Sequence, residues 1–351
     1  MDHPRRAFLE TLLTTATPSG FEAAGQRHWI DYVEAFADDV RTDAYGNAVA
    51  VLEGGESTVA LAGHSDEIGY MVRDIEDTGA IRMTAIGGAD RTVSKGQHVR
   101  IHTDDGPVPG VIGQTAIHMR DREDESLEDI SDQHVDIGAG DADEAATMVE
   151  RGDPITVEQT INDLANDRIA ARGLDNRIGV WAAAEGLRRA ANADPDATVY
   201  AVSTVQEEVG LQGAKMVGFD LDPDVVIATD VTHATDAPGT PSGEKNGIEL
   251  GGGPVVTRGS ANHPRVVRAA REVAADADIE VQLQAAGSRT GTDADAFYTA
   301  RGGTPSLNLG VPNRYMHTPV EVLDLDDLDA TAMLLGAFAA AADEFKFDVD
   351  L

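Results

Sequence analysis

The chain has 351 residues and no cysteine, which excludes disulfide bonds, thiolate metal ligands and a cysteine nucleophile. Its 62 acidic and 27 basic residues give a formal net charge of −35, and this argues against nucleic-acid binding because phosphate contacts need basic patches. The first residues lack the apolar stretch of a signal peptide, and no apolar run approaches the roughly 20 residues that cross a bilayer. We therefore expect a soluble, cytoplasmic protein that contacts neither nucleic acid nor membrane.

Helical patterns open the chain, over residues 4–16 and 21–38. An apolar run over residues 57–62 then predicts a buried strand, which leads into His64 and Asp66. These two side chains share one face of an extended segment, because alternate residues of a strand point to the same side. Imidazole is a common ligand of zinc-like metals, and a neighbouring carboxylate often holds its other ring nitrogen. His64 and Asp66 are therefore a candidate ligand and its supporting acid.

The pattern changes over residues 69–163, where short alternating runs such as 98–101 and 108–112 are separated by turn residues. This texture predicts a small all-β module inserted into an α/β domain. The α/β domain would consist of residues 1–68 and 164–351, with a mixed sheet sandwiched by helices.

Three acidic residues lie at the ends of the next two predicted elements, a helix and a strand. Asp175 lies just before an alanine-rich run over residues 178–193, which predicts a helix with Asp175 near its N-terminus. The buried strand predicted over residues 198–205 ends in Glu207 and Glu208. Neighbouring residues of an extended segment point to opposite sides, so one of these acids suits a metal ligand and the other a proton carrier. Spacing alone does not decide which acid has which role.

Two more strand ends complete the candidate site. The β-branched run over residues 224–229 ends at Asp230, and the strand pattern over 305–310 is followed by a loop that contains His317. In open α/β sheets, binding sites form outside the carboxyl ends of the strands. Two imidazoles and three carboxylates suit two divalent cations that share one carboxylate and hold a bridging hydroxide. The remaining acid of the pair Glu207-Glu208 would carry the proton.

Five segments together resemble the TET aminopeptidases, a family of tetrahedral, dodecameric metallopeptidases that is common in archaea. The segments are Gly63–Gly69 (GHSDEIG), Leu174–Arg177 (LDNR), Gln206–Gly210 (QEEVG), Asp230–Thr232 (DVT) and Arg314–Thr318 (RYMHT). The resemblance implies that the inserted module is a PDZ-like β-barrel through which subunits dimerise. It also implies a homo-oligomer, a tetrahedral dodecamer built from such dimers.

The resemblance further implies a role for each candidate residue. The implied ligands of two divalent metal ions per subunit are His64 and Asp230 for the first ion, Glu208 and His317 for the second, and Asp175 between them. Asp66 would orient His64. Glu207 would be the general base and would then protonate the leaving amine. Zinc is the expected metal, and cobalt or manganese would suit the same nitrogen and oxygen ligands.

We therefore predict a metal-dependent aminopeptidase that removes N-terminal residues from short peptides. A metal-dependent deacylase of N-acyl amino acids has similar ligands and is an alternative. A glucanase is another alternative, and it would use Glu207 and Asp230 as a carboxylate pair without metal. Two features stay open: Arg314 could bind a substrate carboxylate or an internal acid, and residues 288–295 could line the pocket or form a plain acidic loop.

The excess of acid predicts a protein that needs salt. Lysine occurs only at Lys95, Lys215, Lys245 and Lys346. Such an acidic chain repels itself when ions are dilute, and concentrated salt screens that repulsion. We interpret the composition as an adaptation to a salt-rich cytoplasm, of the kind found in haloarchaea.

This interpretation predicts that the melting temperature rises with salt at constant pH. Thermal melts in dilute buffer and in molar potassium chloride measure the effect, and the protein should unfold at a clearly lower temperature in dilute buffer. A melting temperature that stays flat across this range would contradict it.

Overall fold

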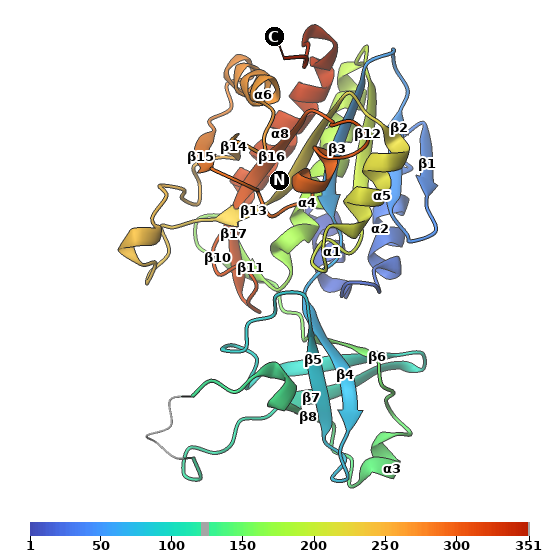
Figure 1. Cartoon of the computed structure of the whole chain (residues 1–351), viewed down its shortest axis with the longest axis vertical. Coiled ribbons are helices and arrows are strands. Elements are labelled where there is room, and N and C mark those ends of the chain that lie inside the picture. The colour runs from blue at the N-terminus through green and yellow to red at the C-terminus, as the bar shows by residue number, and fades with distance from the viewer. Residues whose placement is uncertain (121–125, 350–351) are drawn as a thin grey trace.

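The computed structural model describes residues 1–120 and 126–349 and contains two bodies (Figure 1). The larger body is built on an eight-stranded mixed sheet, and the smaller body is a closed barrel that lies below it in the view. The predicted fold class, an α/β domain with an inserted β-barrel, is confirmed. The domain boundaries drawn from the sequence stay a prediction.

The central sheet places its parallel strands side by side. From one edge to the other, its order is β1 (Asp39–Thr42), β2 (Ala48–Leu52), β12 (Thr198–Thr204), β3 (Thr58–His64), β13 (Val225–His233), β16 (Ser306–Asn313), β14 (Val255–Gly259) and β15 (Gln282–Ala286). Strands β12, β3, β13 and β16 run parallel to one another. Their carboxyl ends therefore meet along one edge of the sheet, where the sequence places its acids and histidines.

Helices cover both faces of this sheet (Figure 1). One core joins the sheet to α1 (His3–Thr14), α2 (Ala23–Val33), α4 (Leu174–Ala193), α6 (Pro264–Asp276) and α8 (Leu325–Ala340). The opposite core contains α5 (Gln212–Leu221) and α7 (Ala294–Phe297). Along β3, Val59 and Leu61 belong to the first core, whereas Ala60 and Ala62 belong to the second. The central strands read as continuous apolar runs because both of their faces are buried.

The inserted barrel consists of six antiparallel strands with their own core. Its strands are β4 (Gly69–Ile75), β5 (Ile81–Ile86), β6 (His98–Thr103), β7 (Gly106–Ile112), β8 (His134–Asp136) and β9 (Pro154–Val157), and a short helix, α3 (Ala142–Ala145), packs beside them. Met83 and Ile101 are fully buried inside it. After the barrel, the chain returns to the α/β body through β10 (Asn162–Leu164) and β11 (Arg168–Ala171). These two strands form a three-stranded sheet with β17 (Glu321–Asp324) from near the C-terminus.

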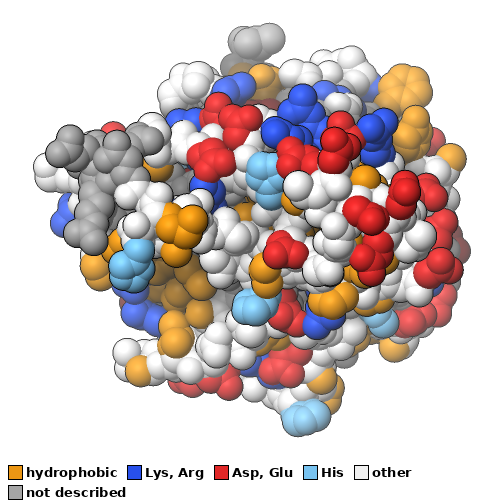
Figure 2. Space-filling model, turned by 90° about the horizontal axis from the view of Figure 1, so that it is seen from below, with side chains coloured by type: hydrophobic (Ala, Val, Ile, Leu, Met, Phe, Trp, Pro, Cys, Tyr) orange, Lys and Arg blue, Asp and Glu red, His pale blue; other side chains and the backbone are white. Residues whose placement is uncertain are grey.

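The surface of the barrel end carries charge of both signs. Figure 2 shows acidic side chains spread over much of this face, with Lys and Arg side chains beside some of them. Arg151 and Asp74, for example, form an exposed ion pair with a distance of 2.5 Å between Nη2 and Oδ1. Within residues 1–120 and 126–349, no helix has the length and apolar character needed to cross a bilayer.

The close approach of β3 to α4 requires glycine at position 63. A Cβ atom added to Gly63 would lie 2.4 Å from the carbonyl carbon of Gly179 and 2.7 Å from the amide nitrogen of Val180. The substitution Gly63→Ala should therefore lower the free energy of unfolding by about 1–3 kcal/mol, because neither backbone can yield without disturbing the core. Chemical denaturation at high salt measures this. Gly113→Ala is the control, because a Cβ there would have no neighbour within 4 Å, and equal effects of the two changes would refute the packing argument.

Candidate active site

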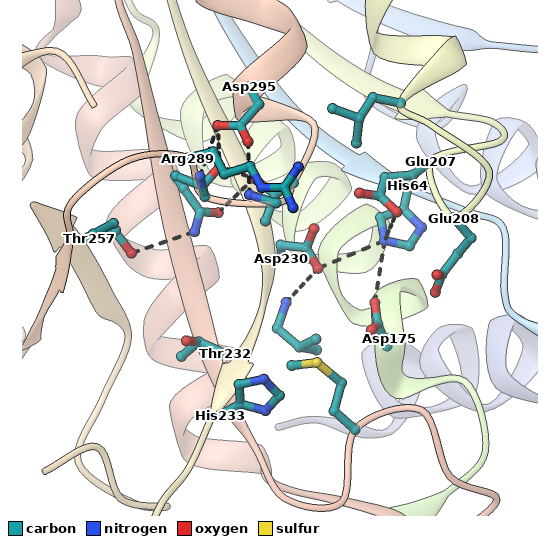
Figure 3. A pocket seen from close by; sticks show the side chains of 18 of the residues that line it. His64, Asp175, Glu207, Glu208, Asp230, Thr232, His233, Thr257, Arg289 and Asp295 are labelled. Carbon is teal, nitrogen blue, oxygen red and sulfur yellow. Dashed lines mark hydrogen bonds and ion pairs between the residues drawn. The ribbon is translucent and has the colours of Figure 1, made fainter. Parts of the chain in front are cut away.

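A cavity of about 800 Å³ opens at the carboxyl edge of the parallel strands (Figure 3). Six of the seven residues predicted from the sequence line it: His64, Asp175, Glu207, Glu208, Asp230 and His317. The seventh, Asp66, is fully buried beside His64. The structure therefore brings together all seven side chains, which come from the end of β3 and the residues after it, the turn after β12, β13, the start of α4 and the loop after β16.

Asp175 lies between the two imidazoles. Its Oδ1 is 3.3 Å from Nε2 of His64, and its Oδ2 is 3.4 Å from Nε2 of His317. The chain is not helical at Asp175 and Asn176, and the peptide bond between them is cis. Asn176 donates a 2.8 Å hydrogen bond from Nδ2 to the carbonyl oxygen of Thr229 on β13. One carboxylate is thus in position to be shared by two sites.

Asp66 supports more of the pocket than His64 alone. Its Oδ1 is 3.2 Å from Nδ1 of His64, and it also accepts the backbone amide of Glu207 at 2.9 Å. Its Oδ2 accepts the amide of Glu208 at 3.2 Å and the hydroxyl of Ser19 at 2.6 Å. The same carboxylate therefore orients the imidazole and sets the backbone turn that carries both glutamates.

A second buried acid, Glu321 on β17, holds the opposite side of the pocket. Its Oε2 accepts the amide of Asp175 at 3.1 Å, and its Oε1 accepts the amide of His317 at 3.0 Å. The inserted barrel also contributes here, because Nδ1 of His317 lies 3.2 Å from the carbonyl oxygen of Gly88. A Cβ at Gly88 would come within 2.8 Å of that nitrogen. The loop after β5 thus fixes the ring from the side away from Asp175.

An ion cluster behind the pocket anchors the start of α4. Glu67 pairs with the guanidinium groups of Arg172 and Arg177, and all three side chains are buried. Burial opposes ionisation of Glu67, but the two arginines lower its pKa to about 2. Arg177 also donates to the carbonyl oxygens of Gly173 and Thr15, at 3.0 and 3.2 Å. This cluster is separate from the acids that face the cavity.

The acids that face the cavity repel one another. Burial raises the pKa of Glu207 to about 9, and the nearby carboxylates of Asp230 and Asp293 add to the shift against the influence of His64. Burial likewise raises the pKa of Glu321 to about 8, with Asp175 contributing. Burial would lower the pKa of His64, but the surrounding carboxylates, Glu207 first, raise it well above its usual value. These shifts indicate that the clustered carboxylates favour positive charge in the pocket.

The donor set fits metal ions. Nδ1 of His64 lies 3.2 Å from Oδ1 of Asp66, and Nδ1 of His317 lies 3.2 Å from the carbonyl oxygen of Gly88, so in both rings Nε2 is the nitrogen that could bind a cation near Asp175. Oε1 of Glu208 is buried and has no hydrogen-bond partner in the described part of the chain. Ligand atoms of three groups lie within 4.8 Å of one another: His64 with Asp175 and Asp230, His64 with Glu207 and Glu208, and Asp175 with Glu208 and His317. Nitrogen and carboxylate ligands of this kind suit zinc, cobalt or manganese.

The two features that the sequence left open are placed by the structure. Arg314 pairs with an internal acid, with distances of 2.9 and 2.5 Å from Nε and Nη2 to the carboxylate of Asp236. From the loop over residues 288–295, Arg289 to Thr292 and Asp295 line the cavity. Sequence reasoning missed three supporting groups: Glu321, Ser19 and the carbonyl of Gly88. Acidic residues and glycines are frequent in this chain, and no local pattern distinguishes these three positions.

Comparison with known proteins places the chain in a family. The family model of the M42 glutamyl aminopeptidases matches residues 46–334. The chain belongs to the M42 family. The lysyl aminopeptidase of Pyrococcus furiosus is 35% identical over 335 residues, which cover 94% of this chain and 95% of that protein. As an M42 protein, the chain is thus related over nearly its whole length to a known aminopeptidase.

Solved structures of TET peptidases share the fold of this M42 chain. The TET aminopeptidase of a marine sediment archaeon, Thaumarchaeota archaeon SCGC AB-539-E09, has a TM-score of 0.90 at 30% identity and covers 96% of both chains. The TET1 peptidase of Pyrococcus horikoshii, described as assembling into a tetrahedron or a large octahedral shell, has a TM-score of 0.85 at 32% identity, with coverage of 95% of this chain and 99% of that one. The resemblance to the TET aminopeptidases is confirmed at the level of family and fold.

The raised pKa values predict how the metal-free protein depends on pH. Between the usual pKa near 4.5 and the folded values of about 9 for Glu207 and about 8 for Glu321, the folded chain holds protons that the unfolded chain has released. The raised pKa values of His64 and His317 act in the same direction. Stability should therefore fall as pH rises from about 5 to 9. Melting temperatures of chelator-treated protein at constant high salt measure this, and a rise over that range would overturn the electrostatic account.

Proposed function

We propose that this M42 protein is a metal-dependent aminopeptidase that removes N-terminal residues from short peptides. One observation carries the proposal: the Asp175 carboxylate lies between Nε2 of His64 and Nε2 of His317, at 3.3 and 3.4 Å. Asp230 and Glu208 lie on either side, with oxygens 3.8 and 3.7 Å from the same two nitrogens. These five residues would hold two divalent ions, with zinc expected. The ions would supply Lewis acidity for the attacking water and the scissile carbonyl.

Glu207 is the proposed proton carrier. Its Oε2 is 3.8 Å from Nε2 of His64, and its amide is held by Asp66. Its pKa of about 9 describes the metal-free pocket, and nearby cations would lower it toward neutrality. Glu207 would accept a proton from the attacking water and return it to the leaving amine. The surrounding carboxylates would attract a free N-terminal ammonium group, which favours exopeptidase action.

The proposal includes an assembly and a setting. Solved TET relatives form a dodecamer, a tetrahedron or an octahedral shell, which supports a tetrahedral dodecamer built from dimers for this chain. The barrel would form the dimer contact, as the resemblance implies. The acidic composition supports a salt-rich, haloarchaeal type of cytoplasm. Light scattering at high salt tests the assembly, and a monomer at all salt concentrations would count against it.

Metal content and substrate preference test the function. Purified protein should contain about two divalent ions per subunit, and exhaustive chelation should abolish cleavage of aminoacyl p-nitroanilides until metal is restored. Substrates with a blocked N-terminus should be poor. A preference for N-acyl substrates would instead identify a deacylase, and hydrolysis of cellulose that survives chelation would identify a glucanase.

The substitution Glu207→Gln should separate proton transfer from metal binding. Turnover at saturating substrate should fall by about 10²- to 10⁴-fold, because an amide cannot carry the proton, while the metal content stays at two ions. The matched change Glu208→Gln should reduce metal content as well as activity, because it removes a proposed ligand. The exposed Glu53→Gln should change neither. Near-native turnover by Glu207→Gln would remove Glu207 from the mechanism.

A further inference from the structure

One positively charged side chain on the wall of the cavity has no role in the proposed chemistry. Arg289 is the only lysine or arginine among the described residues that line the cavity. It lies on the loop between β15 and α7, and Figure 3 shows its guanidinium group directed into the cavity, on the side of Glu207 and Asp230. An arginine in a pocket full of carboxylates would be expected to pair with one of them.

Arg289 nevertheless keeps its donors free. Within residues 1–120 and 126–349, it makes no hydrogen bond or ion pair. The nearby acid Asp295 is occupied, because its Oδ1 accepts the amide and the hydroxyl of Thr290 at 2.9 and 2.8 Å and its Oδ2 accepts the amide of Gly291 at 2.8 Å. Asp295 therefore braces the loop that carries Arg289 without neutralising the guanidinium. Three other arginines near the site have acidic partners: Arg314 pairs with Asp236, and Arg172 and Arg177 pair with Glu67.

The proposed metal ligands would also be unavailable to Arg289. Asp175, Glu208 and Asp230 would face cations of their own in the loaded enzyme, which leaves Arg289 without a partner among the residues that the structure describes. A guanidinium presents a planar fork of donors that matches a carboxylate in two-point contact. The loop and the edge strand β15, which contributes Gln284 to Ala286, line the cavity away from the metal ligands of β3. The same cavity joins this wall to the proposed metal ligands, so one bound peptide could contact both.

We infer that Arg289 binds a carboxylate of the peptide substrate and so decides which peptides are cleaved. This inference rests on the proposed aminopeptidase function. Family membership leaves the charge preference open, because the family is described as glutamyl whereas the Pyrococcus furiosus relative is a lysyl aminopeptidase. The carboxylate belongs either to an acidic N-terminal side chain or to the C-terminus of a short peptide. Both present the same anion to the guanidinium.

Two matched substrate pairs distinguish these sources. Glutamyl and glutaminyl p-nitroanilide differ only in a side-chain carboxylate, and Leu-Gly-Gly and its C-terminal amide differ only in the terminal carboxylate. The ratio of kcat/KM within each pair is measured for metal-loaded enzyme at constant high salt. In one pair, the wild type should favour the carboxylate, and Arg289→Gln should reduce that ratio about 10- to 100-fold, mainly through KM. Arg289→Lys should restore part of it, because the charge remains.

The control is Arg258→Gln. Arg258 is exposed on β14, next to Thr257 in the cavity wall, but does not itself line the cavity. This change should leave both ratios as in the wild type. If both ratios are the same in Arg289→Gln as in the wild type, the inference is wrong although the enzyme is an aminopeptidase. If metal-loaded wild type cleaves neither pair, the aminopeptidase proposal itself fails, and the inference fails with it.

Discussion

The mutual repulsion of buried carboxylates is the constraint on which the whole site depends. Three carboxylates lie close to the two imidazoles. Asp175 and Asp230 are 3.3 and 3.8 Å from Nε2 of His64, and Glu208 is 3.7 Å from Nε2 of His317. Protons neutralise part of the charge in the metal-free chain, as the raised pKa values of Glu207 and His64 indicate. Such a cluster is costly in a folded protein unless cations take the place of those protons. Its presence therefore supports the proposed metal binding.

The segments that carry these carboxylates are held in place by hydrogen bonds to their backbone amides. Asp66 accepts two backbone amides of the glutamate turn, and Glu321 accepts the amides of Asp175 and His317. Each of these acids ties together segments that come from different parts of the chain. Amide hydrogen bonds to carboxylates are strong, and they leave the ligand side chains free to face the cavity. The pocket is thus preorganised by acids that do not themselves enter it.

The inserted barrel contributes to the candidate site as well as to the proposed assembly surface. The carbonyl of Gly88, just beyond β5, lies 3.2 Å from Nδ1 of His317, so one implied ligand is oriented by the barrel. The α/β body supplies the remaining groups at the ends of its parallel strands. Movement of the barrel against the α/β body would therefore disturb His317. This arrangement couples the proposed assembly surface to the proposed chemistry without any additional element.

The sequence by itself determined the strands and most of the site. Continuous apolar runs that end in His64, Glu207 and Asp230 predict buried parallel strands, and such strands bring their ends to one edge whatever the details of packing. Tertiary structure alone decided the supporting contacts. Arg314 pairs with Asp236, and Glu321 accepts two backbone amides, only because segments distant in the sequence meet in the fold. The sequence contains 62 acidic residues, and their local pattern does not indicate which of them pairs with a given group. Arg289 differs from Arg314 for the same reason: whether an arginine has a partner depends on its neighbours in space, which the local sequence pattern does not encode.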